Sequence, residues 1–464
     1  MSLLQLVWKN MRQRSLSTVL TLLSVALGVA LAIALIVTQR EAKNLFGQRD
    51  FGYDLVVGDR GSKLQLVLNM VYGIDMPPGI IPYAMAQDMS RGEMASLVKW
   101  AVPVAATDSL EGFGVLATTP AMLGYDETGQ TRLPEEQRFQ YRLGRSLELA
   151  EGRAFHERKF EAVLGSNVAA TLDLNVGDDF QVTHGKVEAG QQGDVHDEKW
   201  TVVGILDETS TMFDDKVLQS YQSSLALGAH GGVVEAISQL RAEGKEEPPE
   251  REFPDVMANG GVDHEYYVLD PATGLIYLKL DPQLWQISGI YVATRSGFSA
   301  TKLNWQLDNG EIAMAASPAD VMIDFFDQFL APIGLLLLLL TVLVSVLSAL
   351  SILVSIYNSV SARRREMAIL RSLGATRVKL LTLITVEAAL IGLAGAIFGW
   401  LLGHLLSAGA SAMIAARLGE GFSPWTMSAA EWYYVAAVVV MATLAGLVPA
   451  LKAYSTPVAD HLSD

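Results

Sequence analysis

Four side chains that could bind a metal ion lie close together in the stretch HGKVEAGQQGDVHDEKW. They are His184, Asp194, His196 and Asp197. Imidazole and carboxylate groups are ligands that zinc accepts, but this spacing matches no established ligand motif. A solvated hairpin loop in an acidic region explains the same residues. The sequence therefore predicts no metal site here.

Catalytic motifs are absent from the sequence. The chain has no cysteine, which excludes thiolate nucleophiles and cysteine-based zinc sites. There is no G-x-S-x-G elbow, no H-E-x-x-H pair and no G-x-x-x-x-G-K-[ST] loop to hold nucleotide phosphates. The sequence predicts a protein that is not an enzyme and has no cofactor of its own. Its formal net charge of −16 argues against nucleic acid as a partner.

The densest group of basic residues lies in NSVSARRREMAILRSLGATRVK, residues 358–379. Six bases and one acid stand here between two long apolar segments. Apolar residues at helical spacing, followed by Gly374 as a helix stop, predict a short amphipathic helix, and a second helix is predicted to open at ATRVKLL. The pattern leaves two roles open, which are docking of a cytoplasmic partner and binding to membrane lipid.

Four stretches are long and apolar enough to cross a bilayer, which takes about 20 residues. They are residues 16–38, 325–357, 380–407 and 433–451. The first has too long an apolar run for a signal peptide, so it is predicted to be an uncleaved anchor. Basic residues precede it, and the positive-inside rule places the amphipathic segment 1–15, the loop 358–379 and the tail 452–464 in the cytoplasm. The short loop 408–432 is then on the other side.

The long segment 39–324 is predicted to be an external domain of mixed helices and strands. It holds 43 acidic and 23 basic residues, so the acidity of the chain is concentrated here. In FEAVLGSNVAATLDLNVGDDFQVTH, a strand is predicted to lead into the helix SNVAATL, capped by Ser166 or Asn167, and then into a second strand. Residues 226–262 are charged and interrupted by proline and glycine, which predicts a mobile excursion.

Two of the spans are predicted to continue beyond the membrane as stiff helices. The first continues through QREAKNLFGQ, and the second covers about 319–360, with Pro332 as the place of a kink. Stiff helices of this kind are better suited to transmit motion across the membrane than to line a polar channel. Apart from Asp327 at the outer edge of the second span, Glu387 is the one acid within a span. A structural or coupling role is predicted for it rather than proton relay.

Four passages of the sequence resemble the FtsX/MacB/LolC-LolE type of ABC transporter permease, the four-span mechanotransmission class. They are WKNMRQRSLSTVLTLLSVALGVALAIAL, VLGSNVAATLDLNVGDDFQVTHG with KWTVVGIL, RRREMAILRSLGATRVKLLTLITVEAALIGLAGAIFGWLLG, and GLVPALKAYSTPVADHL. The resemblance implies four transmembrane helices and a large external α+β domain of the MacB periplasmic core type. It also implies a multi-pass protein of the bacterial inner membrane.

The resemblance implies partners as well. Two cytoplasmic ATPase subunits, which would bind ATP and Mg²⁺, are expected to work with two permease copies or with this chain and a close homologue. The positions that match the ATPase-coupling motif are Arg363, Arg364, Arg365, Glu366, Leu370, Arg371, Gly374, Ala375 and Thr376. Small residues at helical spacing, Gly28 with Ala32 and Ser345 with Ala349, are predicted to line the interface between the two permeases.

Three functions stay open at this level. The first is a permease that moves a lipoprotein, a peptide or a similar substrate from the periplasm or the membrane. The second is a transmitter that transports nothing and activates a periplasmic partner protein. The third is a zinc-linked uptake or export accessory, suggested by a subgroup resemblance in DLVVGDRGSKLQLVLNMVYGIDMPPGII.

Overall fold

The computed structural model forms two compact units. The part of the chain that it describes comprises residues 9, 11–12, 15–46, 50–74, 76–185, 193–228, 231–242, 244–362, 369, 375–418 and 423–455. The membrane unit comprises Met1–Phe46, Phe326–Ala416 and Gly421–Asp464. The external unit comprises Gly47–Phe325 and the short segment Arg417–Glu420.

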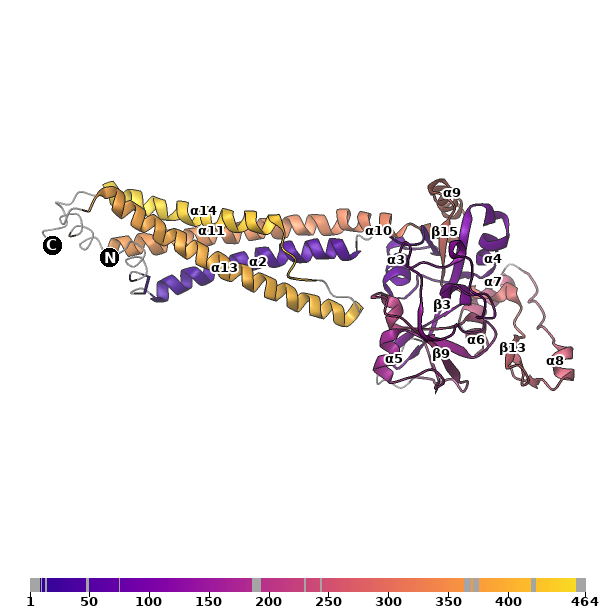
Figure 1. Ribbon diagram of the computed structural model, residues 1–464. Coiled ribbons are helices and arrows are strands. Elements are labelled where there is room, and N and C mark those ends of the chain that lie inside the picture. The colour runs from indigo at the N-terminus through magenta and orange to yellow at the C-terminus, as the bar shows by residue number, and fades with distance from the viewer. Residues whose placement is uncertain are drawn as a thin grey trace. The chain divides into compact units, whose positions relative to one another are not determined.

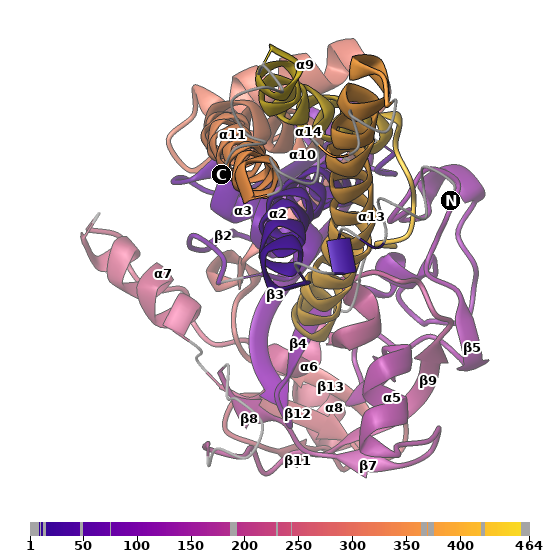
Figure 2. The same ribbon diagram turned by 90° about the vertical axis from the view of Figure 1, so that its left-hand side faces the viewer.

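The membrane unit is built from four long helices that lie alongside one another (Figures 1 and 2). They are α2 (Ser15–Phe46), α11 (Ala331–Ala362), α13 (Arg377–Leu418) and α14 (Ala429–Ser455). Each contains a window apolar enough to cross a bilayer. The helix α13 extends beyond the predicted 380–407, because AGASAMIAARL is rich in alanine and favours helix. The loop before α14 is therefore shorter than the predicted 408–432.

Glycines bring α13 into close contact with α2. Gly395, Gly399 and Gly403 repeat every four residues and face α2. A Cβ atom on Gly399 would lie 2.5 Å from the backbone oxygen of Ala26, and one on Gly403 would lie 2.9 Å from that of Ala30. Such distances are shorter than van der Waals contact. Only glycine allows the two backbones to approach this closely, as is common between membrane helices.

Small residues of the first two spans also pack inside the chain. A Cβ atom on Gly28 of α2 would lie 3.2 Å from Val344 of α11, and Ala32 is buried. The hydroxyl of Ser345 is 2.5 Å from that of Tyr434 on α14. The prediction that these residues line an interface between two permeases is therefore wrong for Gly28, Ala32 and Ser345. Spacing alone shows that a helix face allows close approach, but not which helix approaches it.

The second span is helical well beyond the length of one membrane crossing. The helix α10 (Pro318–Phe325), a π-helical turn (Phe326–Leu330) and α11 follow one another without a gap in the sequence. Together they cover 45 residues. The predicted irregularity near Pro332 takes the form of the π-turn directly before it, because proline cannot donate the hydrogen bond of a regular turn. The boundary between the two units falls at this turn.

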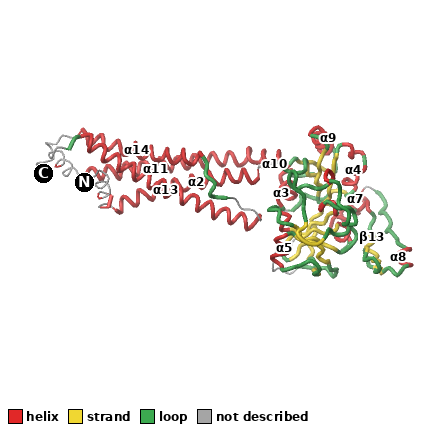
Figure 3. The backbone as a smooth tube through the Cα atoms, in the orientation of Figure 1, coloured by secondary structure: helices red, strands yellow, loops and turns green. Residues whose placement is uncertain are grey.

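The external unit contains an 11-stranded mixed sheet and two smaller sheets, drawn as the yellow strands in Figure 3. The strands of the large sheet are β1 (Leu55–Asp59), β3 (Val98–Leu110), β4 (Phe113–Thr118), β5 (Leu149–Gly152), β6 (Glu161–Leu164), β7 (Asp179–Phe180), β8 (Thr183–His184), β9 (Trp200–Leu206), β10 (Lys216–Ser220), β15 (Gly289–Thr294) and β16 (Ala313–Ala316). Their order is β16-β1-β15-β3-β4-β10-β6-β9-β5, with β7 beside β9 and β8 beside β3. The pairs β4–β10 and β6–β9 are parallel.

The smaller sheets and the helices complete the external unit. The smaller sheets join β11 (Val262–Asp263), β12 (Tyr267–Asp270) and β13 (Leu275–Leu278), and β2 (Ile81–Pro82) with β14 (Gln286–Ile287). The remaining helices are α3 (Lys63–Tyr72), α4 (Ala84–Arg91), α5 (Ser166–Leu172), α6 (Tyr221–Leu225), α7 (Gly231–Ala242), α8 (Pro254–Ala258) and α9 (Gly297–Asp308). Apolar residues of strands and helices form two separate cores.

One local prediction for the external unit, the cap of a helix, needs correction. The helix SNVAATL is α5, but its N-cap is Gly165 rather than Ser166 or Asn167. A Cβ atom at Gly165 would lie 2.4 Å from the backbone oxygen of Phe213, so no side chain fits there. The stretch 226–262, predicted to be a mobile excursion, contains the helix α7. Its apolar residues recur at helical spacing and pack into the core, with Val233 at 2% exposure.

Candidate functional site

Most of the predicted ATPase-coupling positions lie outside the described residues. These are Arg363, Arg364, Arg365, Glu366, Leu370, Arg371 and Gly374. Of the remaining two, Ala375 precedes α13, and Thr376 caps that helix. The backbone N–H of Lys379 donates to Thr376 Oγ1 at 3.4 Å. This bond satisfies a donor of the first helical turn and fixes where α13 begins, as predicted for the second helix.

Glu387, the predicted intramembrane acid, is buried within the membrane unit at 9% exposure. It lies on α13 next to Ala388, which packs against Gly446 of α14. By helical rise it is about 20 Å from Trp400, the first residue of a polar cluster further along α13. The structure therefore does not bring Glu387 into that cluster.

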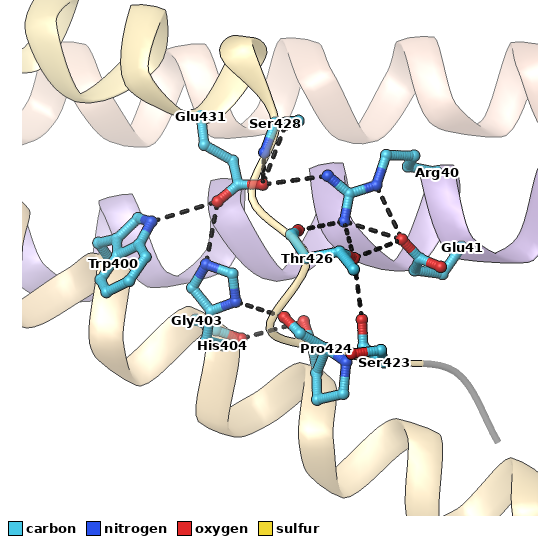
Figure 4. A network of polar contacts seen from close by, with 11 residues as sticks. Arg40, Glu41, Trp400, Gly403, His404, Ser423, Pro424, Thr426, Ser428 and Glu431 are labelled. Carbon is cyan, nitrogen blue, oxygen red and sulfur yellow. Dashed lines mark hydrogen bonds and ion pairs between the residues drawn. The ribbon is translucent and has the colours of Figure 1, made fainter.

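The polar cluster joins three segments of the membrane unit that are far apart in the sequence (Figure 4). It consists of Arg40, Glu41, Trp400, His404, Thr426 and Glu431, together with Ser428 at the start of α14. Arg40 and Glu41 come from α2, and the tryptophan and histidine from α13. The cluster thus connects three helices through charged and polar side chains.

Glu431 is the centre of the polar cluster and is fully buried. Its Oε1 accepts bonds from Ser428 N at 2.9 Å and from Arg40 Nη1 at 3.3 Å. Its Oε2 accepts from Trp400 Nε1 at 3.2 Å and lies 2.9 Å from His404 Nε2. A buried carboxylate is costly unless it is paired and hydrogen-bonded, and this one has both kinds of partner.

The contacts of His404 fix the orientation of its ring. Its Nδ1 faces the backbone oxygen of Pro424. Its Nε2 faces the Glu431 carboxylate, which also accepts from Trp400 and Ser428. Both ring nitrogens thus have an oxygen partner, and the buried imidazole is held between α14 and the segment before it.

Arg40 carries the connection to the first helix. Its Nε donates to Glu41 Oε1 at 2.8 Å, and its Nη2 donates to Thr426 Oγ1 at 2.7 Å. The threonine hydroxyl in turn donates to Glu41 Oε1 at 3.0 Å. The hydroxyls of Thr426 and Ser428 both donate to carboxylates of the cluster, which leaves few lone pairs free for a ligand. Its chemistry is that of a fixed connection between α2, α13 and α14.

The sequence analysis missed this cluster, although two signals for it are present. SAAE, from Ser428 to Glu431, is a capping-box pattern before an apolar run, and Ser428 N donates to Glu431 as that box requires. His404 is an ionisable residue in a span, which is a functional candidate by the same rule that selected Glu387. Their pairing depends on helix packing, which spacing alone does not give.

In the external unit, two of the four metal candidates come together. His184 and His196 lie near Asp108, and one donor atom of each falls within 4.8 Å of the others. Asp194 and Asp197 are exposed and are not part of this group. Asp108 was not a sequence candidate, because it lies 76 residues before His184 on a different strand.

Two family models match the chain. The model of the MacB-like periplasmic core domain matches residues 18–308, and that of the FtsX-like permease C-terminal region matches residues 333–458. The first covers more than half of the chain. The second covers three of the four long helices and the predicted coupling segment, which lies between α11 and α13. No curated protein matches this sequence.

Proposed function

The chain belongs to the FtsX/MacB/LolC-LolE type of ABC transporter permeases, and we propose that it transmits the ATPase cycle of a separate cytoplasmic subunit to its external unit. The observation that carries this proposal is the length of two helices. The helix α2 has 32 residues, and α10, the π-turn and α11 together have 45. The longer one measures about 68 Å by helical rise, about twice the hydrocarbon thickness.

The packing of the membrane unit supports transmission by whole helices. The cavity between α2, α11 and α14 has a volume of about 10 Å³, which is too small for a substrate. Glycine contacts hold α13 against α2, and the polar cluster links both to α14. Such a bundle moves as packed rods rather than as the wall of a channel. The substrate that we propose therefore stays on the periplasmic side or comes from the membrane, as a lipoprotein or a peptide would.

The closed bundle suits a second function equally well. A transmitter that moves no substrate and activates a periplasmic partner needs the same rods and the same ATPase contact. The two functions differ in what the external unit binds. In both, the basic loop 358–379 and both termini are cytoplasmic, in keeping with the positive-inside rule.

The proposed contact with the ATPase can be tested at the coupling loop. We expect the double substitution Leu370→Asp and Gly374→Asp to abolish the stimulation of ATP hydrolysis in the reconstituted complex, while the amount of inserted permease is unchanged. Val262→Asp is the matched control, because Val262 is an exposed apolar residue of the external unit at 46% exposure. Stimulated hydrolysis that is equal in the double variant and the control would overturn the proposal.

A further inference from the structure

Backbone pairing in the external unit places one aspartate and two histidines on a common face. Asp108 of β3 and His184 of β8 are direct cross-strand partners. The chain then returns antiparallel to β8, with Thr183 opposite Val195. In this ladder His196 lies opposite Val182 and diagonal to His184, on the same face. The hydrogen bonds of two adjacent ladders thus fix the positions of the three side chains.

The strand that carries the aspartate is irregular at this point. The register of β3 against β4 shifts between Ala106 and Ser109, an irregularity of the β-bulge kind that interrupts the pairing at Asp108, and pairing resumes at Ser109. Bulges re-aim side chains and are frequent beside functional sites. Ser109 Oγ donates to the backbone oxygen of Gly185 at 2.7 Å and holds β8 against the bulge.

The carboxylate of Asp108 is buried without a hydrogen bond. The side chain is fully buried, and neither oxygen accepts a hydrogen bond from the residues that the structure describes. Its Oδ1 lies 3.5 Å from His196 Nε2 and 3.8 Å from His184 Nδ1. These distances are too long for hydrogen bonds. A buried carboxylate in this state costs free energy, and a bound ion or water is a common partner for such groups.

The separations fit three ligands around one metal ion. In a tetrahedral zinc site with bonds of 2.0–2.1 Å, donor atoms lie about 3.3 Å apart. The contact with His196 is close to this value, and a small rotation of the exposed His184 ring reaches it. Nitrogen and carboxylate donors in this number are typical of zinc sites that keep one position open.

A cavity adjoins the two histidines. A cavity of about 540 Å³ is lined by His184, His196 and further polar residues, among them His264 and Glu265. The Nε2 atom of His264 is buried and has no hydrogen-bond partner within the described chain. A metal held by the three ligands would therefore be accessible from one side, with additional donors nearby.

We propose that Asp108, His184 and His196 form a binding site for a divalent transition-metal ion, with Zn²⁺ as the best match to the donors. The site is independent of the proposed coupling to an ATPase, since it lies wholly within the external unit. Asp108 supplies the negative charge and anchors the site in the sheet. The histidines complete it from the hairpin, and a fourth ligand enters from the cavity.

The test uses the full-length chain in detergent, purified without a polyhistidine tag and stripped with a chelator. Titration with Zn²⁺ against a competing indicator is expected to give one high-affinity ion per chain. Asp108→Asn, His184→Ala and His196→Ala are each expected to weaken binding by about 10- to 100-fold or more. Glu252→Gln, an exposed carboxylate of the external unit that does not line the cavity, is the matched control and should bind like the unsubstituted chain.

A stability measurement separates loss of the site from loss of the fold. Zinc should raise the thermal unfolding midpoint of the unsubstituted chain and leave that of Asp108→Asn unchanged. Without zinc, Asp108→Asn should be at least as stable as the unsubstituted chain, because it removes a buried carboxylate that accepts no hydrogen bond from the described residues. The proposal is overturned if a triple variant with Asp108→Asn, His184→Ala and His196→Ala binds zinc as tightly as the unsubstituted chain. It is also overturned if zinc stabilises Asp108→Asn to the same extent.

Discussion

Glu431 and His404 are hydrogen-bonded through Oε2 and Nε2 at 2.9 Å, with their side chains 1% and 0% exposed. The bond joins the first turn of α14 to the middle of α13. Arg40 adds α2 to the same carboxylate. A buried carboxylate with this many donors is a fixed point of the bundle, and removing it leaves Arg40, Trp400 and His404 without their shared partner.

The first prediction concerns this buried pair. Glu431→Leu is expected to destabilise the detergent-solubilised chain by about 3–5 kcal/mol, because it leaves His404 and Arg40 without the shared carboxylate. The double variant Glu431→Leu with His404→Leu should lose less stability than the single variant Glu431→Leu. The measurement is the thermal unfolding midpoint, with the exposed Glu252→Leu as control. His404→Leu alone is measured as well, and losses of the two single variants that simply add up in the double variant would show that the pair is not coupled.

The second prediction concerns the contact between α13 and α2. Gly399→Val is expected to lower the thermal unfolding midpoint, because its Cβ atom would lie 2.5 Å from the Ala26 backbone oxygen and overpacking costs about 1–3 kcal/mol. Gly409→Val on the same helix is the control, since nothing lies within 4 Å of its Cβ position. If both variants unfold at the same temperature, the close contact does not hold the bundle together.

Much of the architecture could be predicted from the sequence, because it depends on local patterns. Apolar runs of about 20 residues define the spans. The helical extensions of the first two spans follow from the absence of helix breakers in QREAKNLF and ADVMIDFF. The start of α13 follows from Thr376 as an N-cap. These features depend on neighbours within a few residues, which the sequence shows directly.

Features that depend on distant residues could not be predicted in the same way. Gly28 and Ser345 have the spacing of an interface, but they pack against helices of their own chain. Asp108 joins two histidines only because β8 pairs with the bulged end of β3. The partners of His404 and Glu431 likewise depend on how the helices pack. Spacing identifies a face, whereas tertiary structure decides what covers it.

The third prediction is a pH dependence of the external unit. Burial raises the pKa of Glu161, but hydrogen bonds from Arg153 and from the His156 backbone outweigh it and hold the pKa below its ordinary value. A carboxyl with a lowered pKa stabilises the fold above the unfolded-state value of about 4.3 and loses this contribution as the pH falls through the folded-state value. The external unit should therefore lose stability below about pH 4 in part through this residue.

The measurement compares Glu161→Gln with the unsubstituted chain across pH. The variant should unfold at a lower temperature at pH 7, and the difference should shrink as the pH falls below about 4. Glu148→Gln is the control, because its ion pair with Arg132 is exposed and such pairs contribute about 0–1 kcal/mol. A difference that stays constant between pH 7 and pH 3 would contradict the assignment.

The fourth prediction concerns topology. The chain has no cysteine, so single cysteines report their own location. A cysteine in place of the exposed Glu250 of the external unit should react with a membrane-impermeant maleimide once the outer membrane is opened. A cysteine in place of Ser361, near the basic loop, should react only after the inner membrane is permeabilised. The reverse pattern would place the external unit in the cytoplasm.

The last prediction concerns assembly and motion. Only 22% of the apolar window of α11 is buried within the chain, against 44% for α2. Its exposed leucines and valines, including Leu343, Leu347, Leu350 and Val354, form a surface for lipid or for a second permease. The family resemblance implies two permeases around a two-fold axis, and we expect this surface of α11 to face that axis. The interface thus depends on large exposed residues rather than on the small residues that the sequence suggested.

Crosslinking can test both the contact and its movement. The double variant Asn44→Cys with Asp327→Cys places thiols on exposed positions near the outer ends of α2 and α11. In the complex with its ATPase, it should give a band at twice the mass of the chain, with a yield that changes when nucleotide is trapped. The same experiment with Met413→Cys, exposed on α13, should give a yield that does not depend on nucleotide. A helix that transmits closure must change the distance between its own end and that of its partner. Identical yields with and without trapped nucleotide at several positions along α2 and α11 would therefore mean that these helices do not carry the motion.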